Sequence, residues 1–356
     1  MKFLSGFFKG ECMQKRIETP GKLLNENGEL YEAGYATALI KEYVRADIKA
    51  DPLRIKEWDY YLVNDGDYGL ALTIADNSYM GLMSVSWLDF TKPCETTKSE
   101  MIFMPRGKTN LPATSLKGDV SFHNAALDLS FYNNGKTRRL VCVYRNFKDG
   151  KTLQADVTLT DVPRDSMVIC TPYREDPKAF YYNQKINCLR AEGYMSLGTE
   201  GHRFSKDSAF AVLDWGRGVW TYSNTWYWAS LSAETDGHTF GFNLGYGFGD
   251  TSAASENMVF VDGIAHKLSQ VTFNIPFTED GKEDYMKPWT FTSDDGRLNL
   301  DFVPVIDRAS LTDFKILCSD QHQVFGRFSG TVILDDGSPF EIKNLPGFAE
   351  KVKNKW

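Results

Sequence analysis

The sequence predicts a mainly β protein with few helices, and three observations support this. Asn-Gly and Asp-Gly pairs, which accept the positive φ angles of tight hairpin turns, recur along the whole chain. Runs typical of strands flank most of these pairs. Aromatic residues make up 14% of the 356 residues, and many lie in such runs, which favours strands. The pairs are Asn27-Gly28, Asp65-Gly66, Asn134-Gly135, Asp149-Gly150, Asp236-Gly237, Asp262-Gly263, Asp280-Gly281, Asp295-Gly296 and Asp336-Gly337.

The clearest hairpin surrounds Asn134-Gly135. Residues 127–131 alternate apolar and polar side chains before this turn, and the β-branched and aromatic run 140–144 follows it. Helices are expected at only two places. Apolar positions recur at helical spacing in residues 31–50, and residues 347–356 are expected to form a last short helix. Further strands are expected at 153–159, 239–244 and 331–334.

A change of composition at residues 162–182 predicts a boundary between two halves of the chain. Three prolines gather there beside the charged segment Arg174-Glu175-Asp176. We therefore expect an N-terminal extension with a helix (1–50), a first β-lobe (51–175) and a second β-lobe (176–356). Each lobe is expected to be an antiparallel barrel or a strongly curved sheet.

Composition narrows the class of partner. A net charge of −7 and a pI near 5.4 give no global basic field, so no nucleic-acid partner is expected. The six cysteines are scattered without a CxxC pair, as is typical of free thiols in a reducing cytosol. The apolar run at residues 3–8 is too short for an export signal, so we expect a cytoplasmic protein. No transmembrane segment is expected, because no run approaches about 20 apolar residues.

Motifs for metals and cofactors are not found. The five histidines are far apart and form neither HxH nor HExxH, so no metal site is expected. No Gly-rich phosphate loop follows a strand, and no GxSxG frame announces a serine hydrolase. The sequence therefore predicts a protein that works without a cofactor.

One stretch, residues 213–263, combines four of the eight tryptophans with amides and carboxylates. A fold needs apolar alternation in its strands, but an aromatic-walled ligand site would also need oriented polar groups. Even spacing places four of these aromatic residues on one face of a strand, with Tyr227 opposite, so that both faces are covered. The four could line a cavity or could equally be barrel core. Candidate ligand-binding residues are Arg217, Trp220, Tyr222, Trp226, Trp228, Asn243 and Asn257, and candidate catalytic residues are Asp214 and Glu256.

Several motifs resemble a bacterial family known as domain of unknown function 2804. They include Lys56-Glu57-Trp58-Asp59-Tyr60-Tyr61, Tyr181-Tyr182-Asn183-Gln184-Lys185, Phe325-Gly326-Arg327-Phe328-Ser329-Gly330 and Gly347-Phe348-Ala349-Glu350, and they cover nearly the whole chain. More distantly, Glu192-Gly193-Tyr194 with Leu213-Asp214-Trp215-Gly216 is similar to two-domain lipocalin-like proteins such as carotenoid hydratases and tocopherol cyclase. This resemblance implies paired lipocalin-like β-domains with a hydrophobic cavity.

Each candidate has a chemical interpretation and a structural one. Asp214 could be a general acid whose pKa is raised by desolvation, with Glu256 as assisting base, or the two could cap a turn and form a surface salt bridge. Arg217 could hold an anionic or carbonyl group of a ligand, or form a local ion pair with Asp214. Asn243 and Asn257 could orient a ligand hydroxyl, although turn and capping roles are commoner for asparagine.

The leading hypothesis is a cofactor-independent lyase, hydratase or isomerase acting on a hydrophobic, isoprenoid-like small molecule. Protonation of an alkene needs one acid of raised pKa and an aromatic wall that stabilises the developing cation. A non-catalytic lipid or isoprenoid carrier is the first alternative. A carbohydrate-active enzyme is the second, because aromatic platforms with paired carboxylates also suit sugars.

Overall fold

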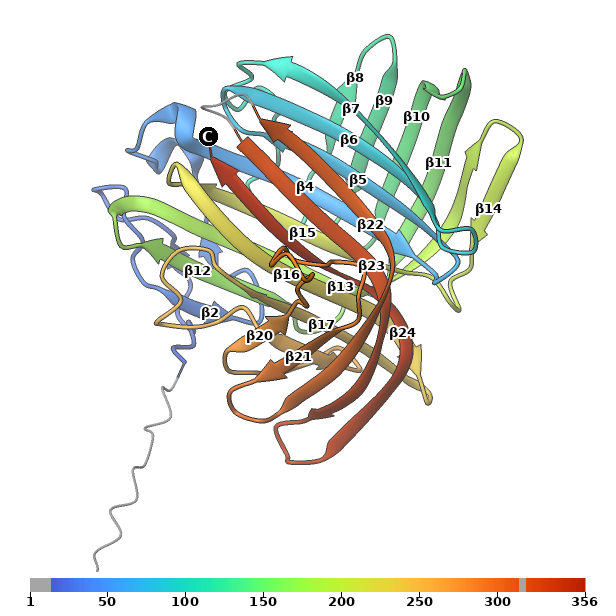
Figure 1. Cartoon of the computed structure of the whole chain (residues 1–356). Helices are drawn as coiled ribbons and strands as arrows, with labels where there is room; N and C mark the ends of the chain where they lie inside the picture. The colour runs from blue at the N-terminus through green and yellow to red at the C-terminus, as the bar shows by residue number, and fades with distance from the viewer. Residues whose placement is uncertain (1–13, 314–317, 356) are drawn as a thin grey trace, which may run out of the picture.

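The computed structural model describes residues 14–313 and 318–355, and these form two large antiparallel β-sheets. Both sheets are curled like half-barrels, the first blue to yellow and the second yellow to red in Figure 1. The mainly β prediction is therefore confirmed. The first sheet contains β2 (Gly34–Ala36), β4 (Ile55–Asn64), β5 (Tyr68–Asp76), β6 (Met80–Asp89), β7 (Cys94–Phe103), β8 (Val120–His123), β9 (Leu127–Asn133), β10 (Arg138–Lys148), β11 (Lys151–Thr160), β12 (Met167–Tyr173), β13 (Asp176–Leu197), β14 (Glu200–Phe204) and β15 (Phe210–Val219).

The second sheet is formed by the strands that follow β15 in the chain. Its strand order is β19-β18-β17-β16-β24-β23-β22-β21-β20, so the chain's last strand lies at its centre beside β16. Its strands are β16 (Ser223–Thr235), β17 (His238–Tyr246), β18 (Met258–Val261), β19 (Ile264–Lys267), β20 (Val271–Asn274), β21 (Trp289–Ser293), β22 (Leu298–Asp313), β23 (Cys318–Ile333) and β24 (Pro339–Lys355).

The division between the sheets differs from the predicted lobe boundary at residues 175 and 176. Strands β13, β14 and β15 pair within the first sheet, and the chain crosses to the second sheet at residues 220–222. The proline-rich segment instead marks β12 and its tight connection to β13. Strand β13 pairs with β11, β12, β14 and β15 along its length. Its pairing with β15 is irregular between Ile186 and Leu189, where Cys188 has a φ of 61°.

The two expected helices are wrong. Residues 31–50 contain the short strands β2 and β3 (Lys41–Glu42, paired with β1, Gly21–Lys22) and the 3-10 turn η1 (Arg45–Asp47). Pairing of β2 with β12 overrides the local helical spacing, since tertiary contacts routinely outweigh propensity. Residues 347–355 belong to β24, which pairs on both sides, with β16 and β23.

The Asn134-Gly135 hairpin is confirmed. It joins β9 to β10 with Gly135 at a φ of 90°, and the strands extend slightly beyond the predicted runs. The described helices are two 3-10 turns, η1 and η2 (Pro52–Arg54), so no helix in this part of the chain is long enough to cross a membrane. The signal-like start and Cys12 lie outside the described residues.

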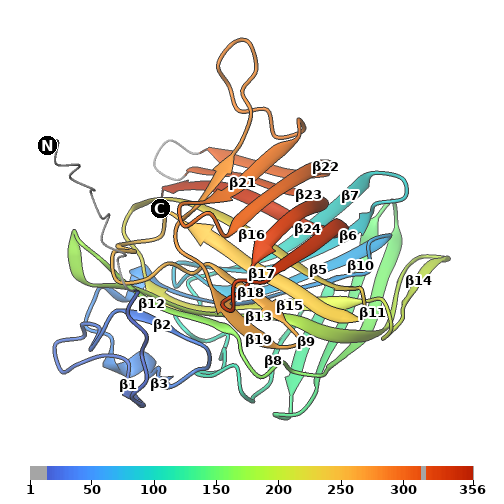
Figure 2. The ribbon, with the colours of Figure 1, turned by 90° about the horizontal axis from the view of Figure 1, so that it is seen from below.

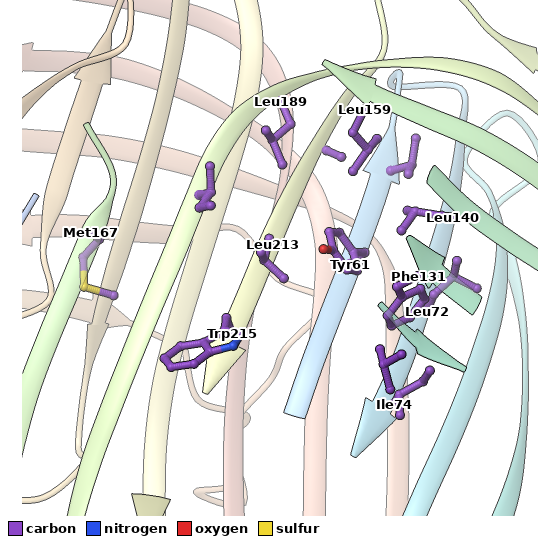
Figure 3. Close-up of a cluster of buried hydrophobic side chains, with 14 of the residues drawn as sticks. Tyr61, Leu72, Ile74, Phe131, Leu140, Leu159, Met167, Leu189, Leu213 and Trp215 are labelled. Carbon is purple, nitrogen blue, oxygen red and sulfur yellow. The ribbon is translucent and has the colours of Figure 1, made fainter. Parts of the chain in front are cut away.

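Each sheet wraps its own apolar core, and a third apolar cluster lies between them. In the first core, Leu213 and Trp215 of β15 and Tyr61 of β4 point inward, and the Tyr61 ring meets Phe131 edge-on at 5.0 Å (Figure 3). The second core is built around Phe240, Phe291 and Phe328 and their neighbours.

The third cluster joins the lobes. Figures 1 and 2 both show β22, β23 and β24 lying against the part of the first sheet that contains β5 and β6. Arg308 of β22 donates to Ser86 Oγ of β6 at 2.7 Å, and Phe325 of β23 packs on Phe90 at 5.5 Å. The buried apolar members are Tyr60, Leu62, Ala71, Leu88, Val212, Trp228, Ile306, Phe325 and Phe348. This inter-lobe layer contains the polar groups described next.

Candidate functional site

Strand β15 presents its side chains to two different environments. All ten of its residues are buried, because one face lines the first core and the other meets the second lobe. Leu213 and Trp215 belong to the core face. Val212 and Asp214 belong to the inter-lobe face, so this strand delivers one carboxylate into the layer between the sheets.

Asp214 forms a buried ion pair. Its Oδ2 lies 2.9 Å from Lys185 Nζ on the adjacent strand β13, and Asn183 Nδ2 donates to Oδ1 at 2.6 Å. The side chains of Lys185 and Asp214 are only 4% and 9% exposed. The register that pairs Lys185 with Asp214 therefore creates a fixed charge pair inside the protein.

Lys185 connects this pair to the second lobe. Its Nζ lies 3.8 Å from the centroid of the Trp228 ring on β16. Trp228 Nε1 donates to Asn243 Oδ1 at 2.7 Å, and Asn243 Nδ2 donates to the Glu256 carbonyl at 2.9 Å and more weakly to its Oε2 at 3.3 Å. One chain of contacts thus runs from Asp214 to Glu256 across the lobe boundary.

Glu256 is buried above a glycine. An added Cβ on Gly245 would lie 2.8 Å from the Glu256 carboxyl carbon, so the glycine makes room for the acid. Burial raises the pKa of Glu256 above the ordinary 4.5, and Asp214 adds to the rise, while Lys185 and the Asn243 hydrogen bond oppose it. Glu256 therefore retains its proton to a higher pH than an exposed glutamate does.

Glu350 of β24 is a second buried acid in the same layer. Trp226 Nε1 donates to its Oε1 at 2.9 Å, and Gln323 Nε2 donates to its Oε2 at 2.9 Å. Burial raises the pKa of Glu350 above 4.5, and the Trp226 hydrogen bond and the Lys185 charge only partly oppose this. The hydroxyl of Tyr60, from β4 of the first lobe, lies 3.4 Å from Gln323 Oε1.

An aromatic group closes one side of the layer. Tyr181 of β13 stacks on Trp58 at 6.1 Å and on Phe248 at 4.5 Å, and Phe248 also lies 4.9 Å from Trp226. Burial raises the pKa of Tyr181 well above 10.0, and the negative charges of Glu256, Asp214 and Glu350 raise it further. Tyr181 is thus a neutral hydroxyl in the field of all three carboxyl groups.

We call the aromatic residues on this side of the layer the aromatic wall; they are Trp58, Tyr181, Trp220, Trp226 and Phe248. A glycine makes room for one of them. An added Cβ on Gly216 would lie 2.0 Å from the Trp58 indole, so this indole packs directly on the β15 backbone. In the pairing of β15 with β4, Gly216 lies opposite Trp58, and Asp214 lies opposite Tyr60 two positions along the strand.

The predicted residues separate into two groups. Asp214, Glu256, Trp226, Trp228 and Asn243 come together between the lobes, and Tyr227 points into the second core, as the even spacing predicts. Trp220 joins the aromatic wall through Trp58 and Trp226. Tyr222 lies in the crossover between the sheets and is 57% exposed.

Arg217 lies in the first lobe, and the predicted ion pair with Asp214 is not formed. Because Arg217 is three residues from Asp214 in a strand, it points to the opposite face. Its guanidinium pairs with Asp59 at 2.9 Å and donates to the carbonyls of Trp58, Gly216 and Pro112. This network fixes the loop at Pro112 within the first lobe.

Asn257 also has a structural role. Its Oδ1 accepts from Gly245 N at 2.7 Å, and its Nδ2 donates to the Ser269 carbonyl at 2.8 Å. These bonds hold the loop that carries Glu256. Asn257 therefore positions the segment that carries the acid.

Sequence reasoning missed Lys185, Tyr181 and Glu350. The first two lie at alternate positions with Asn183, a polar row on one face of β13. That alternation is visible in the sequence. The sequence did not indicate Glu350 as a site residue, because residues 347–356 were expected to form a helix.

A depression of about 520 Å³ lies beside the loop that carries Phe248. None of the carboxyl groups of Asp214, Glu256 and Glu350 lines it. Gly247 and Gly249, which flank Phe248, do line it, together with Asn224 and Thr225, which precede Trp226. Phe248 itself does not line it and packs on Tyr181 and Trp226.

Metal ligands are not grouped in the described part of the chain. Within residues 14–313 and 318–355, no three side chains of His, Cys, Asp or Glu are arranged to hold an ion. The chemistry that the inter-lobe layer can perform directly is proton transfer by its carboxyl groups.

The chain belongs to the family described as "Domain of unknown function (DUF2804)", whose model matches residues 14–356. A candidate AttH protein from Nitrosomonas europaea has a similar fold, with a TM-score of 0.54 and 10% identity over 88% of this chain and 96% of that chain. CghA with Sch210972 matches with a TM-score of 0.52 and 11% identity, over 94% of this chain and 96% of that chain. At these identities the likeness concerns the fold alone. A search of curated proteins found no match.

Proposed function

We propose that the inter-lobe layer is the active site of a cofactor-independent lyase, hydratase or isomerase that acts on a hydrophobic small molecule. The observation that carries this proposal is the presence of two buried acids, Glu256 and Glu350, whose pKa values are raised by burial; Trp226 donates to Glu350, and Asn243 connects Glu256 to Trp228. A neutral carboxylic acid in an apolar setting is the group that proton donation to a carbon–carbon double bond requires.

The assignment of roles differs from the one that the sequence suggests. Asp214 is paired with Lys185 and accepts a second hydrogen bond from Asn183, so it acts as a fixed anion. Glu256 and Glu350 are the proton donors. Whichever of them has given up its proton then serves as the base that takes a proton from a neighbouring carbon or from an added water.

The indole rings supply the complementary electrostatics. A developing carbocation is stabilised by the negative face of an aromatic ring, and more strongly where water is excluded. Trp226 donates to Glu350, so its ring lies beside one of the two acids. The face of Trp228 and the Asp214 carboxylate are already occupied by the Lys185 ammonium, at 3.8 and 2.9 Å.

Structures that resemble this fold support the proposal only generally. One of them was solved with a small molecule, Sch210972. We infer from this and from the acid pair that the partner of this chain is a small molecule that binds between the lobes.

The test begins with the ligand. Wild-type protein is extracted with organic solvent, and bound small molecules are identified by mass spectrometry. The recovered compound is then incubated with protein in D₂O, and deuterium incorporation at carbon is measured. The matched variants are Glu256→Gln, Glu350→Gln and the exposed control Glu200→Gln.

The expected result is deuterium transfer that falls by about 10²-fold or more in one or both buried variants, the size of a general acid contribution, and not in the control. Equal turnover in all four proteins would refute the catalytic assignment. Tight binding of the compound without any turnover would identify the protein as a carrier instead.

A further inference from the structure

Strand β7 has a neighbouring strand on one side only. It lies at one end of the first sheet and pairs with β6 along all ten of its residues, from Cys94 opposite Asp89 to Phe103 opposite Met80. The strands at the other ends of the two sheets, β8, β19 and β20, have four residues each. Because half of the N–H and C=O groups of an edge strand point away from its sheet, β7 presents the longest row of such groups at a sheet end in the described chain.

This edge lacks the features with which natural sheets prevent further pairing. Residues 94–103 contain no proline, and their pairing with β6 has no bulge. The alternate residues Thr97, Ser99, Met101 and Phe103 share one face of the strand, and none of them is charged. Met101 is 69% exposed and Phe103 is 89% exposed. A long, regular edge with exposed apolar side chains favours pairing with another strand.

The charged residues Lys98 and Glu100 lie on the opposite face of β7, toward the first core. Lys98 Nζ donates to the Asn146 carbonyl at 2.7 Å. Glu100 accepts hydrogen bonds from the Tyr144 hydroxyl at 2.7 Å and from Asn124 Nδ2 at 2.9 Å. These contacts orient both side chains, and each group keeps donors or acceptor sites for a further partner.

The order of these charges makes β7 complementary to a second copy of itself. Two identical antiparallel strands are related by a twofold axis at one residue, and residues opposite each other share a face. With the axis at Ser99, Lys98 of each copy lies opposite Glu100 of the other. With the axis at Lys98 or at Glu100, two like charges would lie opposite each other. Opposite charges across two strands are stabilising and like charges are destabilising, so the axis at Ser99 is favoured.

The same register covers the exposed apolar side chains of the strand. It places Thr97 opposite Met101 and Glu95 opposite Phe103, on the face that bears Ser99. Cross-strand neighbours of this kind remove apolar area from water. Met101 and Phe103 therefore become less exposed in such a pair.

We propose that β7 is a dimer interface, at which it pairs antiparallel with β7 of a second copy of this chain about a twofold axis at Ser99. The first sheets of the two copies then form one continuous sheet. This inference is independent of the proposed function, because Asp214, Glu256 and Glu350 lie outside β7.

The experiment measures the molar mass of the full chain by analytical ultracentrifugation over a range of protein concentrations. The charge-reversal variants Lys98→Glu and Glu100→Lys are measured separately and as an equimolar mixture. Circular dichroism checks that each variant keeps its β structure.

A second variant tests the outer face of the strand. Met101→Lys combined with Phe103→Lys adds charge to the exposed side chains and leaves the inner contacts of Lys98 intact. The controls Lys136→Glu and Glu200→Lys reverse exposed charges outside β7.

Wild-type protein is expected to form a dimer with about twice the 40.3 kDa mass of the chain. Each charge reversal alone should raise the dimer dissociation constant by about tenfold or more, because both cross-strand pairs then join like charges. The mixture should dimerise about as tightly as wild type, because each pair again joins an acidic to a basic side chain. Met101→Lys with Phe103→Lys should be monomeric, and both controls should match wild type.

A wild-type monomer at every concentration would overturn the proposal. A dimer that all β7 variants retain would also overturn it, because the contact would then lie on another surface. The same holds for a mixture that does not restore the dimer lost in the single charge reversals, since the register about Ser99 requires this restoration. If the charge reversals lose their β structure, a dimer that persists in Met101→Lys with Phe103→Lys overturns the proposal.

Discussion

Replacing Lys185 by methionine removes the ammonium group that pairs with Asp214 between the lobes. The two groups are 2.9 Å apart, and both side chains are less than one-tenth exposed. Removing one partner of such a pair leaves an uncompensated buried charge, which costs about 3–5 kcal/mol. We therefore expect Lys185→Met to lower the free energy of unfolding by about 3–5 kcal/mol at pH 7.

The assay is urea unfolding at pH 7 followed by tryptophan fluorescence. The double variant Lys185→Met with Asp214→Asn should return to within about 1 kcal/mol of wild type, since neither charge is then left buried. Lys206→Met, which breaks the exposed pair with Asp161, should cost less than about 1 kcal/mol. A loss below about 1 kcal/mol for Lys185→Met at pH 7 would refute the reasoning.

Three further variants test the structure by urea unfolding. Gly216→Ala should cost about 1–3 kcal/mol, because its Cβ would lie 2.0 Å from the Trp58 indole; an unchanged stability would contradict this packing. Arg217→Met should cost about 3–5 kcal/mol, since it leaves Asp59 buried without its cation, and a loss as small as that of a surface pair would rule this out. Burial lowers the pKa of Lys267 to about 7, so at this position the unfolded chain binds more protons than the folded one between pH 7 and 8; wild-type stability should gain more over that window than the stability of Lys267→Met. An equally steep rise in this variant would exclude Lys267 as its source.

Local turn chemistry made the β fold predictable. Asn134-Gly135 forms its hairpin because Gly135 adopts a φ of 90°, which few other residues accept, and this requirement is visible in the dipeptide itself. The same holds for Asp236-Gly237, which joins β16 to β17 with φ angles of 51° and 81°. Such signals depend on adjacent residues only.

The sheet boundary was not predictable in this way. A turn between strands of one sheet has the same local chemistry as a turn that leads into another sheet. The crossover at residues 220–222 contains Trp220, Thr221 and Tyr222, with neither glycine nor proline. Helical spacing in residues 31–50 did not predict the structure of that segment either, because its strand β2 forms by pairing with β12, for example Ala36 with Val168.

The sequence predicted only those residues of the candidate site that lie close together along the chain. Asp214, Trp226 and Trp228 could be found as a cluster in one stretch of sequence. Lys185 and Glu350 reach this layer only through strand register and packing of the two sheets, so no spacing rule connects them to it. Arg217, close to Asp214 in sequence, belongs to the other face of its strand.

The central claim is that burial between the lobes favours the neutral form of a carboxylic acid. Infrared spectroscopy measures this directly, because a protonated carboxyl has a carbonyl band that an ionised one lacks. Burial raises the pKa of Glu256 and Glu350 above 4.5, so each keeps its proton to a higher pH than an exposed glutamate does. In a titration followed by this band, the account predicts that wild-type protein has a component that disappears at higher pH than the band of exposed carboxyl groups, that weakens in Glu256→Gln or Glu350→Gln and that is unchanged in Glu200→Gln. A titration without this late component, or one that neither buried substitution alters, would contradict it.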